Sequence, residues 1–448
     1  MPVHPIEWRY GSKEMRSIFE VKTRFQLMLD VEAALAKALA KVGLIPKADA
    51  AKIAESASIN LVSMKRIQEI DKEVQHETMA LVTALAEVSG ESGRYVHLGA
   101  TSNDILDTAT ALQIREGLNI IEADLRKLLR VLLEKATKYK DTIMVGRTHG
   151  QHAVPTTFGM KFAIWASEFG RHVERLMQLK PRVLVGKMSG AVGTGAAWGG
   201  KGQNVQRLVM EELKLSPAPA SNQILQRDRL AELITFFGLL ASSMEKIARE
   251  IRNLQRTEIG EVSEPFMTKQ IGSSTMPQKR NPYRCEKICS LAKVIRGNAQ
   301  AALENVVLEH ERDLTNSACE RVIIPESFLL IEDMLKTSIF VLGDLIVFPD
   351  QMKRNLELTR GLNMSEAIMI ELTRKGMNRQ DAHALLRKCS AIAIVEVKPL
   401  LAVLSRDAEV TKYIPAVELE KLLDPNEYLG DASAIVQKVV RELQPLTK

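Results

Sequence analysis

The sequence predicts an all-α protein of three helical domains, with a bundle of long helices at its centre. Two observations support this fold class. Apolar residues recur at helical spacing over long stretches, and Leu, Ala, Glu, Lys and Arg, all strong helix formers, dominate the composition. No stretch sustains the apolar–polar alternation of a half-buried strand. At 448 residues the chain also exceeds what one hydrophobic core usually supports, so we expect several domains.

The central bundle is predicted from amphipathic segments of unusual length. In the clearest one, apolar residues from Leu230 to Leu254 advance by one, three or four positions, which predicts a helix from about Gln226 to about Val262. The same spacing predicts four further helices, at Ile105 to Leu132, Thr157 to Leu179, Pro282 to Val307 and Glu320 to Leu345. Their apolar faces exceed what one chain can cover, so we expect the helices to associate between subunits.

Smaller helical domains are expected on either side of the bundle. Helices are predicted over Met15 to Val42 and Ile70 to Val88, and beyond the bundle glycines and prolines divide the chain into short helices. Thr142 to Val145 and Val183 to Val185 are candidates for short strands. The predicted domains are residues 1–96, 97–346 and 347–448.

Charge and composition argue against several classes of protein. The formal charge of +6 is modest for this length and the basic residues are scattered, which disfavours nucleic-acid binding and suits an anionic small molecule. We find no signal peptide and no apolar run near the roughly 20 residues of a membrane helix, so we expect a cytoplasmic protein without a membrane partner. The four cysteines give neither a disulfide framework nor a zinc site.

Polar or glycine-rich segments interrupt the helices at HLGATSND, GRTHGQHAVPTTFG, GKMSGAVGTGAAWGGKG and IGSSTMPQKRNP. In the first, the hydroxyls of Thr101 and Ser102 can cap the following helix, or can join its free amides in binding a carboxylate or phosphate. Taken singly, the cap is favoured. In the third, Gly195 to Lys201 has the spacing of a nucleotide-binding loop, but Gly202 stands where Ser or Thr is needed for Mg²⁺, which argues against such a loop.

The second segment carries two histidines, His149 and His152. No nearby carboxylate or cysteine completes a metal site, so we expect no metal. An imidazole suits proton transfer near neutral pH, which makes His149 a candidate general acid or base. A hydrogen-bonded structural histidine is the alternative, and it is favoured when this segment is taken alone.

The fourth segment, Ile271 to Pro282, feeds a helix whose N-cap and first residue are predicted to be Asn281 and Pro282. The positive end of a helix stabilises anions. Lys279, amide donors and this helix end could therefore stabilise an alkoxide on Ser273 if water is excluded. A capped helix start behind a polar loop is the alternative.

Three of these segments, in this order, resemble the signature regions of the fumarase/aspartase superfamily: TSND, GRTHGQHAVPTTFG and GSSTMPQKRNP. Within the superfamily, GKMSGAVGT, QILQRDR and EHERDLTNSACER are most similar to the adenylosuccinate lyase family. The resemblance implies elimination of fumarate from adenylosuccinate and from succinylated aminoimidazole carboxamide ribotide, without a cofactor. It also implies a homotetramer whose core is the helix bundle and whose active sites each use three subunits.

The resemblance also implies roles for individual residues. By resemblance, Ser273 is the general base and His149 the general acid, His76 contacts the substrate and supports His149, and Lys279 with Asn281 stabilises the carbanion-like intermediate. The remaining implied substrate contacts are Thr101 and Ser102 for the fumarate-side carboxylate, Gln223, and, for the nucleotide and its phosphate, Arg9, Tyr10, Arg312, Ser317 and Arg321.

Three positions depart from the family's pattern. Gln75 and Glu77 flank His76 where many relatives have Arg and Asp, and Lys287 stands where arginine is common, so their substrate contacts remain open. The alternatives are another lyase of the superfamily, acting on argininosuccinate or cyclising carboxymuconate, and a non-catalytic structural homologue.

Overall fold

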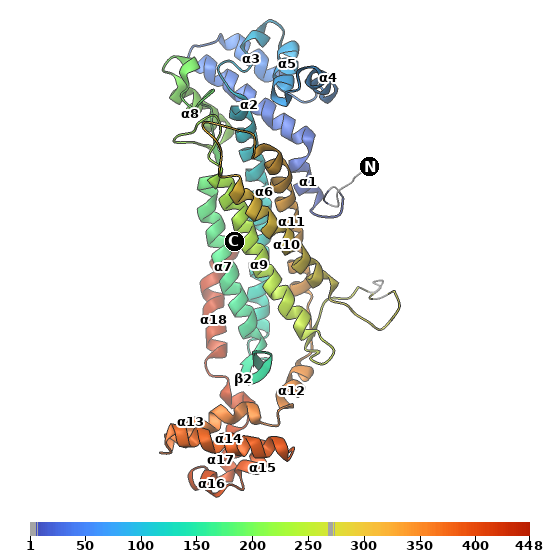
Figure 1. The fold of residues 1–448 in the computed structure, drawn as a ribbon, viewed down its shortest axis with the longest axis vertical. Helices are drawn as coiled ribbons and strands as arrows, with labels where there is room; N and C mark the ends of the chain where they lie inside the picture. Colours follow the sequence, from blue (N-terminus) through green and yellow to red (C-terminus); the bar gives the residue numbers. More distant parts are fainter. Residues whose placement is uncertain (1–5, 7, 268–271, 273) are drawn as a thin grey trace. The chain divides into compact units, whose positions relative to one another are not determined.

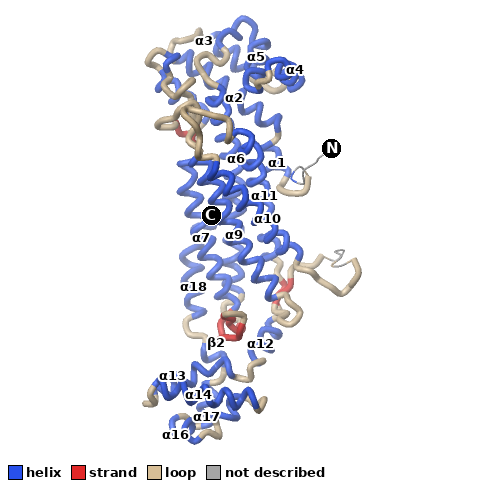
Figure 2. The backbone as a smooth tube through the Cα atoms, in the orientation of Figure 1, coloured by secondary structure: helices blue, strands red, loops and turns tan. Residues whose placement is uncertain are grey.

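The computed structural model describes Ile6, residues 8–267, Gly272 and residues 274–448. Figure 2 shows that helices dominate and that strands are short, which confirms the predicted all-α class. The described residues form two compact units. The first unit comprises those within Met1–Leu125, His172–Glu245 and Ile288–Thr337, and the second those within Arg126–Arg171, Lys246–Lys287 and Ser338–Lys448. The division into three domains stays a prediction.

The first unit begins with five helices (Figure 1). They are α1 (Lys13–Phe19), α2 (Val21–Lys41), α3 (Lys47–Ser56), α4 (Met64–Val74) and α5 (Glu77–Ser89). Two predicted helices are each divided in two. Glu20 is extended between α1 and α2, with φ −61° and ψ 144°, and Gln75 adopts the left-handed conformation between α4 and α5, with φ 51°. Apolar periodicity continues across both breaks, so it does not reveal them.

All five helices predicted for the bundle are present. They are α6 (Ser102–Lys138), α7 (Phe158–Val183), α9 (Asp228–Leu254), α10 (Tyr283–Glu304) and α11 (Ser317–Gly343). The prediction for α9 was too long. It ends at Leu254 rather than near Val262, because the chain turns through Gly260, whose φ is +59°, and the amide of Glu261 donates back to the Leu254 carbonyl.

The helices of the first unit share apolar cores. One core lies where α2 packs against α3 and against α8 (Gly202–Leu213). Phe328 on α11 meets Phe237 on α9 edge to face, with ring centroids 5.0 Å apart. A Cβ at Gly117 on α6 would lie only 2.7 Å from the Phe328 ring, so glycine is needed for this close approach. Short elements complete the unit: β3 (Val185–Gly186), paired in parallel with β4 (Ser216–Pro217), and the 3-10 turns η2 (Gly90–Tyr95) and η3 (Ala196–Trp198).

The second unit holds the hairpin of β1 (Ile143–Thr148) and β2 (Gln151–Thr157), the pair β5 (Val262–Ser263) and β6 (Ile346–Val347), and short C-terminal helices. Phe158 and Phe162 on α7 form an aromatic cluster with Tyr139 and Trp165. The C-terminal elements are α12 (Pro349–Glu357), η4 (Leu362–Met364), α13 (Ser365–Arg374), α14 (Arg379–Val395), α15 (Leu400–Leu404), α16 (Ala408–Tyr413), α17 (Ala416–Leu422), η5 (Pro425–Tyr428), α18 (Ala432–Leu443) and η6 (Gln444–Thr447). No helix in the described part of the chain is long and apolar enough to cross a membrane.

Candidate active site

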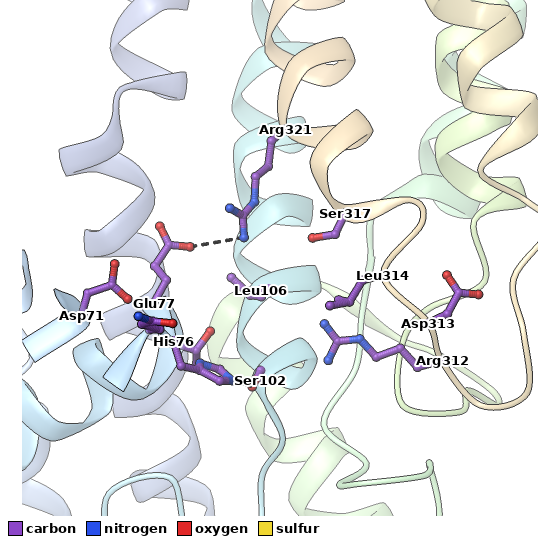
Figure 3. A pocket seen from close by; sticks show the side chains of 12 residues that line it. Asp71, His76, Glu77, Ser102, Leu106, Arg312, Asp313, Leu314, Ser317 and Arg321 are labelled. Carbon is purple, nitrogen blue, oxygen red and sulfur yellow. Dashed lines mark hydrogen bonds and ion pairs between the residues drawn. The ribbon is translucent and has the colours of Figure 1, made fainter. Parts of the chain in front are cut away.

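A pocket of about 720 Å³ lies in the first unit, where the segment joining α4 to α5 faces the starts of α6 and α11 (Figure 3). Its volume suits a ligand of nucleotide size. Seven residues predicted from the sequence line it together: Gln75, His76, Glu77, Ser102, Arg312, Ser317 and Arg321. Residues from three separate regions of the chain therefore meet in one cavity.

His76 is the N-cap of α5, and its ring is held from two sides. Its Nδ1 accepts a hydrogen bond from the Met79 amide at 3.3 Å, and its Nε2 lies 3.4 Å from the Ser102 hydroxyl. Because Nδ1 is an acceptor, the neutral ring carries its proton on Nε2 and directs it toward Ser102. The fold thus pairs a histidine and a serine that are 26 positions apart in the sequence.

Glu77 forms an ion-pair cluster at the wall of the pocket. Both of its carboxylate oxygens accept hydrogen bonds from Arg24 at 2.7 Å, and Arg321 approaches within 3.7 Å, as Figure 3 shows. Burial alone would raise the pKa of Glu77, but the hydrogen bonds and charge of Arg24, with the charge of Arg321, lower it overall. Glu77 is therefore an anion that orients Arg321 beside Ser317.

Gln223 and Arg312 are joined directly. The Arg312 guanidinium donates to Gln223 Oε1 at 2.9 Å, and Gln223 Nε2 donates to the Ala191 carbonyl at 3.0 Å. Gln223 is outside the residues that line the pocket, but it fixes one face of an arginine that does line it. Arg9 and Tyr10 are also outside the lining residues, and the Arg9 guanidinium stacks over the Trp8 ring.

The start of α6 shows the acidic half of a capping box, and the predicted hydroxyl cap stays a prediction. The amide of Thr101 donates to the carboxylate of Asp104 at 2.9 Å, so the cap contact described here comes from the acidic residue in the first turn. Ser102 is the first residue of α6 and faces the pocket.

His149 lies in the second unit, at the exposed tip of the β1–β2 hairpin, with φ +54°. The hairpin is anchored two residues earlier, where the Arg147 guanidinium donates to both carboxylate oxygens of the fully buried Glu261, at 2.6 and 3.0 Å. His152 is the strand partner of Arg147. Burial, then the charge of Arg147, lowers the pKa of His152, so this histidine is neutral near pH 7.

The proposed base, Ser273, lies outside the described residues, but the loop ends around it are described in the second unit. Asn281 Nδ2 donates to the Gly272 carbonyl at 3.0 Å. A Cβ on Gly272 would lie 1.9 Å from the Lys279 carbonyl oxygen, so only glycine permits this approach. Lys279 itself has an exposed side chain.

The start of α10 differs from the prediction. Its first residue is Tyr283, and the Pro282 carbonyl accepts the first helical hydrogen bond from Glu286, so Pro282 occupies the N-cap position that was predicted for Asn281. The buried Glu264 caps the helix. Its carboxylate accepts hydrogen bonds from the amides of Arg284 and Cys285, at 3.2 and 2.6 Å. Lys287 follows on the same helix and is partly buried.

Sequence reasoning missed several residues of the pocket. Arg24 does not line the pocket but holds Glu77, which does; it lies 53 positions from Glu77, and no local pattern links the two. Asp313 and Leu314 belong to a segment that was singled out, whereas Asp71 and Leu106 gave no separate signal. Within the described residues, no group of three or more His, Cys, Asp or Glu side chains could hold a metal ion.

Comparison with known proteins shows that this chain is a lyase. A family model described as lyase matches residues 9–297. Two solved structures share the whole fold. A fumarate lyase from Mesorhizobium sp. BNC1 has a TM-score of 0.90 and 36% identity, covering 98% of this chain and 100% of that one. A 3-carboxy-cis,cis-muconate lactonizing enzyme from Pseudomonas putida has a TM-score of 0.90 and 38% identity, with 99% of both chains covered.

Sequence comparison narrows the class further. The adenylosuccinate lyase of Pyrococcus horikoshii is 55% identical over 448 residues, which is all of this chain and 99% of that protein. The adenylosuccinate lyase of Methanocaldococcus jannaschii is 49% identical over 446 residues, covering 99% and 96%. A model of the adenylosuccinate lyase C-terminus matches residues 361–439. The chain belongs to the adenylosuccinate lyase family, whose members are carbon–nitrogen lyases.

Proposed function

We propose that this protein cleaves adenylosuccinate into AMP and fumarate, and cleaves succinylated aminoimidazole carboxamide ribotide into its carboxamide and fumarate. The observation that carries the proposal is the full-length identity of 55% with an adenylosuccinate lyase. The pocket agrees with it, because Arg312, Ser317 and Arg321 offer two guanidinium groups and a hydroxyl to a phosphate.

The proposed reaction is a β-elimination. Ser273, as an alkoxide, removes the proton from the carbon beside a carboxylate, and the freed electron pair is delocalised into that carboxylate as an aci-carboxylate. Lys279 and Asn281 stabilise the added negative charge. The pair then forms the double bond of fumarate while the carbon–nitrogen bond breaks, and His149 protonates the departing nitrogen. No cofactor takes part.

We assign Ser102, which lines the pocket, and its neighbour Thr101, which does not, to the fumarate-side carboxylate, and His76 to a substrate contact beside Ser102. The short path from His76 Nε2 to the Ser102 hydroxyl supports this, because one ligand oxygen could accept from both. Gln223 acts through Arg312, to which it is hydrogen-bonded. Arg9 and Tyr10 are assigned to the nucleotide by resemblance.

We also propose a cytoplasmic homotetramer in which subunits share active sites. Apolar side chains left exposed on the long helices support subunit contacts. Leu239 on α9 is 47% exposed, Val294 on α10 is 40% exposed and Val322 on α11 is 60% exposed. Light scattering should give a mass near four chains, and a monomer at working concentration would contradict the assembly.

The decisive experiment measures fumarate release by the purified protein from adenylosuccinate and from argininosuccinate. Loss of ultraviolet absorbance by 3-carboxymuconate tests the third substrate, because its cyclisation releases no fumarate. Turnover of adenylosuccinate alone is expected, and absence of fumarate from it would falsify the proposal. Ser273→Ala and His149→Gln should each lower kcat by about 10²–10⁴-fold while AMP still binds in calorimetry. Near-normal turnover by Ser273→Ala would show that another group is the base.

A further inference from the structure

A lysine and an aspartate form a completely buried ion pair in the first unit, two positions along α6 from the pocket residue Ser102. The side chains of Asp104, on the first turn of α6, and Lys187, just after β3, are both 0% exposed, and Lys187 Nζ lies 2.5 Å from Asp104 Oδ1. Neither residue belongs to the proposed chemistry, and neither lines the pocket. A charged pair removed from water in this way needs a compensating network.

That network consists of backbone groups from three segments. Asp104 accepts hydrogen bonds from the amides of Thr101 at 2.9 Å, Ser189 at 2.9 Å and Gly190 at 3.0 Å. Lys187 Nζ donates to the carbonyl of Gln223 at 2.9 Å. The pair therefore ties the start of α6, the glycine-rich segment after β3 and the segment that carries Gln223 to one point.

Two of these segments, the start of α6 and the segment of Gln223, bear on substrate binding. Thr101 and its neighbour Ser102 are assigned to the carboxylate, and Gln223 holds the pocket arginine Arg312 through its side chain at 2.9 Å. The backbone of Lys187 is fixed in turn by Thr108 on α6, whose hydroxyl accepts from the Lys187 amide and donates to its carbonyl. A shift of the pair would displace both sides of the pocket together.

Buried ion pairs contribute little net stability compared with apolar residues of similar volume, although removing one partner is strongly destabilising. The pair is therefore not needed for stability alone. Its geometry fixes the positions of the segments that it joins instead. Hydrogen bonds from four donors to the carboxylate, and from the ammonium group to a carbonyl, are directional, whereas apolar packing is not.

We propose that Asp104 and Lys187 are positioning residues that hold Thr101, Ser102, Gln223 and Arg312 in the geometry that binds the substrate. This inference rests on the proposed function. The two residues touch neither the substrate nor the reacting atoms, and they act through the backbone of the segments that do.

The test is a double-mutant cycle with Lys187→Met, Asp104→Asn and the combined variant, studied as the full-length protein. Fumarate release gives kcat and KM, and thermal unfolding gives the midpoint. Ser243→Ala is the matched control, because it breaks a buried hydrogen bond to His172 in the same unit, at 2.8 Å, away from the pair. It should lower the midpoint without changing KM.

Each single variant should raise KM about tenfold or more, with kcat/KM down about 10²-fold. The combined variant should have a thermal unfolding midpoint near that of the wild type, because no unpaired buried charge remains. Its KM should stay as high as in the single variants. Recovery of KM along with the midpoint in the combined variant would overturn the positioning role. So would a KM within about twofold of wild type in any folded variant of Asp104 or Lys187.

A failure of the proposed function remains distinguishable. If the wild-type protein releases no fumarate, amide hydrogen exchange still tests whether the pair positions these segments, because it needs no activity. Amides of residues 101–104, 187–191 and 221–225 should exchange faster in Lys187→Met than in Ser243→Ala. Equal exchange in the two variants would refute the positioning role.

Discussion

Replacing Arg321 by methionine should weaken substrate binding through the phosphate alone. Methionine keeps most of the side-chain length and removes the guanidinium from beside Ser317. Glu77 stays neutralised in this variant, because Arg24 already donates to both of its carboxylate oxygens at 2.7 Å. The change therefore removes one cation from the pocket without leaving an unpaired carboxylate in its wall.

The magnitude follows from the exposure of the side chain. A hydrogen bond to a charged group contributes about 1.5–3 kcal/mol. The Arg321 side chain is 59% exposed, so solvent screening places its contribution near the lower limit, at about 1.5 kcal/mol. With about 1.4 kcal/mol for each factor of ten, KM for adenylosuccinate should rise about tenfold, while kcat changes little.

The assay compares adenylosuccinate with the corresponding nucleoside, which lacks the phosphate. Arg321→Met should raise KM for the nucleotide and leave kcat/KM for the nucleoside almost unchanged. Arg207→Met is a suitable control, because Arg207 is 52% exposed and pairs with Glu211 on the surface of α8. An equal loss on both substrates would refute the assignment of Arg321 to the phosphate.

Three further predictions concern pH, the loop and the hairpin. Burial opposes protonation of His97, but the charge and hydrogen bond of Glu32 raise its pKa overall. The pair of His97 and Glu32 therefore stabilises the folded state fully below about pH 6.5, and less as pH rises through the raised pKa of His97. The difference in melting temperature between wild type and His97→Asn should accordingly shrink from about pH 6 to about pH 9, and a constant difference would exclude this linkage. Gly272→Ala should lower kcat by about tenfold or more with little change in melting temperature, because its Cβ would displace the Lys279 carbonyl; unaltered turnover would show that the loop tolerates the shift. Glu261→Gln leaves its arginine partner without a counter-charge and should cost about 3–5 kcal/mol in denaturant unfolding, so an unchanged midpoint would contradict the anchoring of the hairpin.

The helices could be predicted because their apolar spacing is a local property. The stripe from Leu230 to Leu254 is α9 itself. The breaks were not predictable in the same way, since Gln75 takes a left-handed conformation inside a sequence whose apolar pattern continues. The role of Glu264 as the cap of α10 was not predictable from local sequence either, because Glu264 lies 20 positions before the residue that it caps.

The candidate site was predictable in its parts but not in its arrangement. A local signal marked Ser102 at a predicted helix start, whereas Arg312 was singled out only by resemblance to a family, which gave both residues their roles. The direct contact between Gln223 and Arg312, and the pairing of Glu77 with Arg24, depend on tertiary packing that no periodicity in one sequence encodes. The assignment of Ser273 stays a prediction.

The carboxylate of Glu264 affects which free anions can bind at the start of α10. Inorganic phosphate and sulfate bind readily where a helix offers unoccupied amides. At α10 the amides of Arg284 and Cys285 already have a permanent partner from within the chain. Phosphate and sulfate therefore have no free donor at these two amides, and the arginines of the pocket are the better place for such anions to bind.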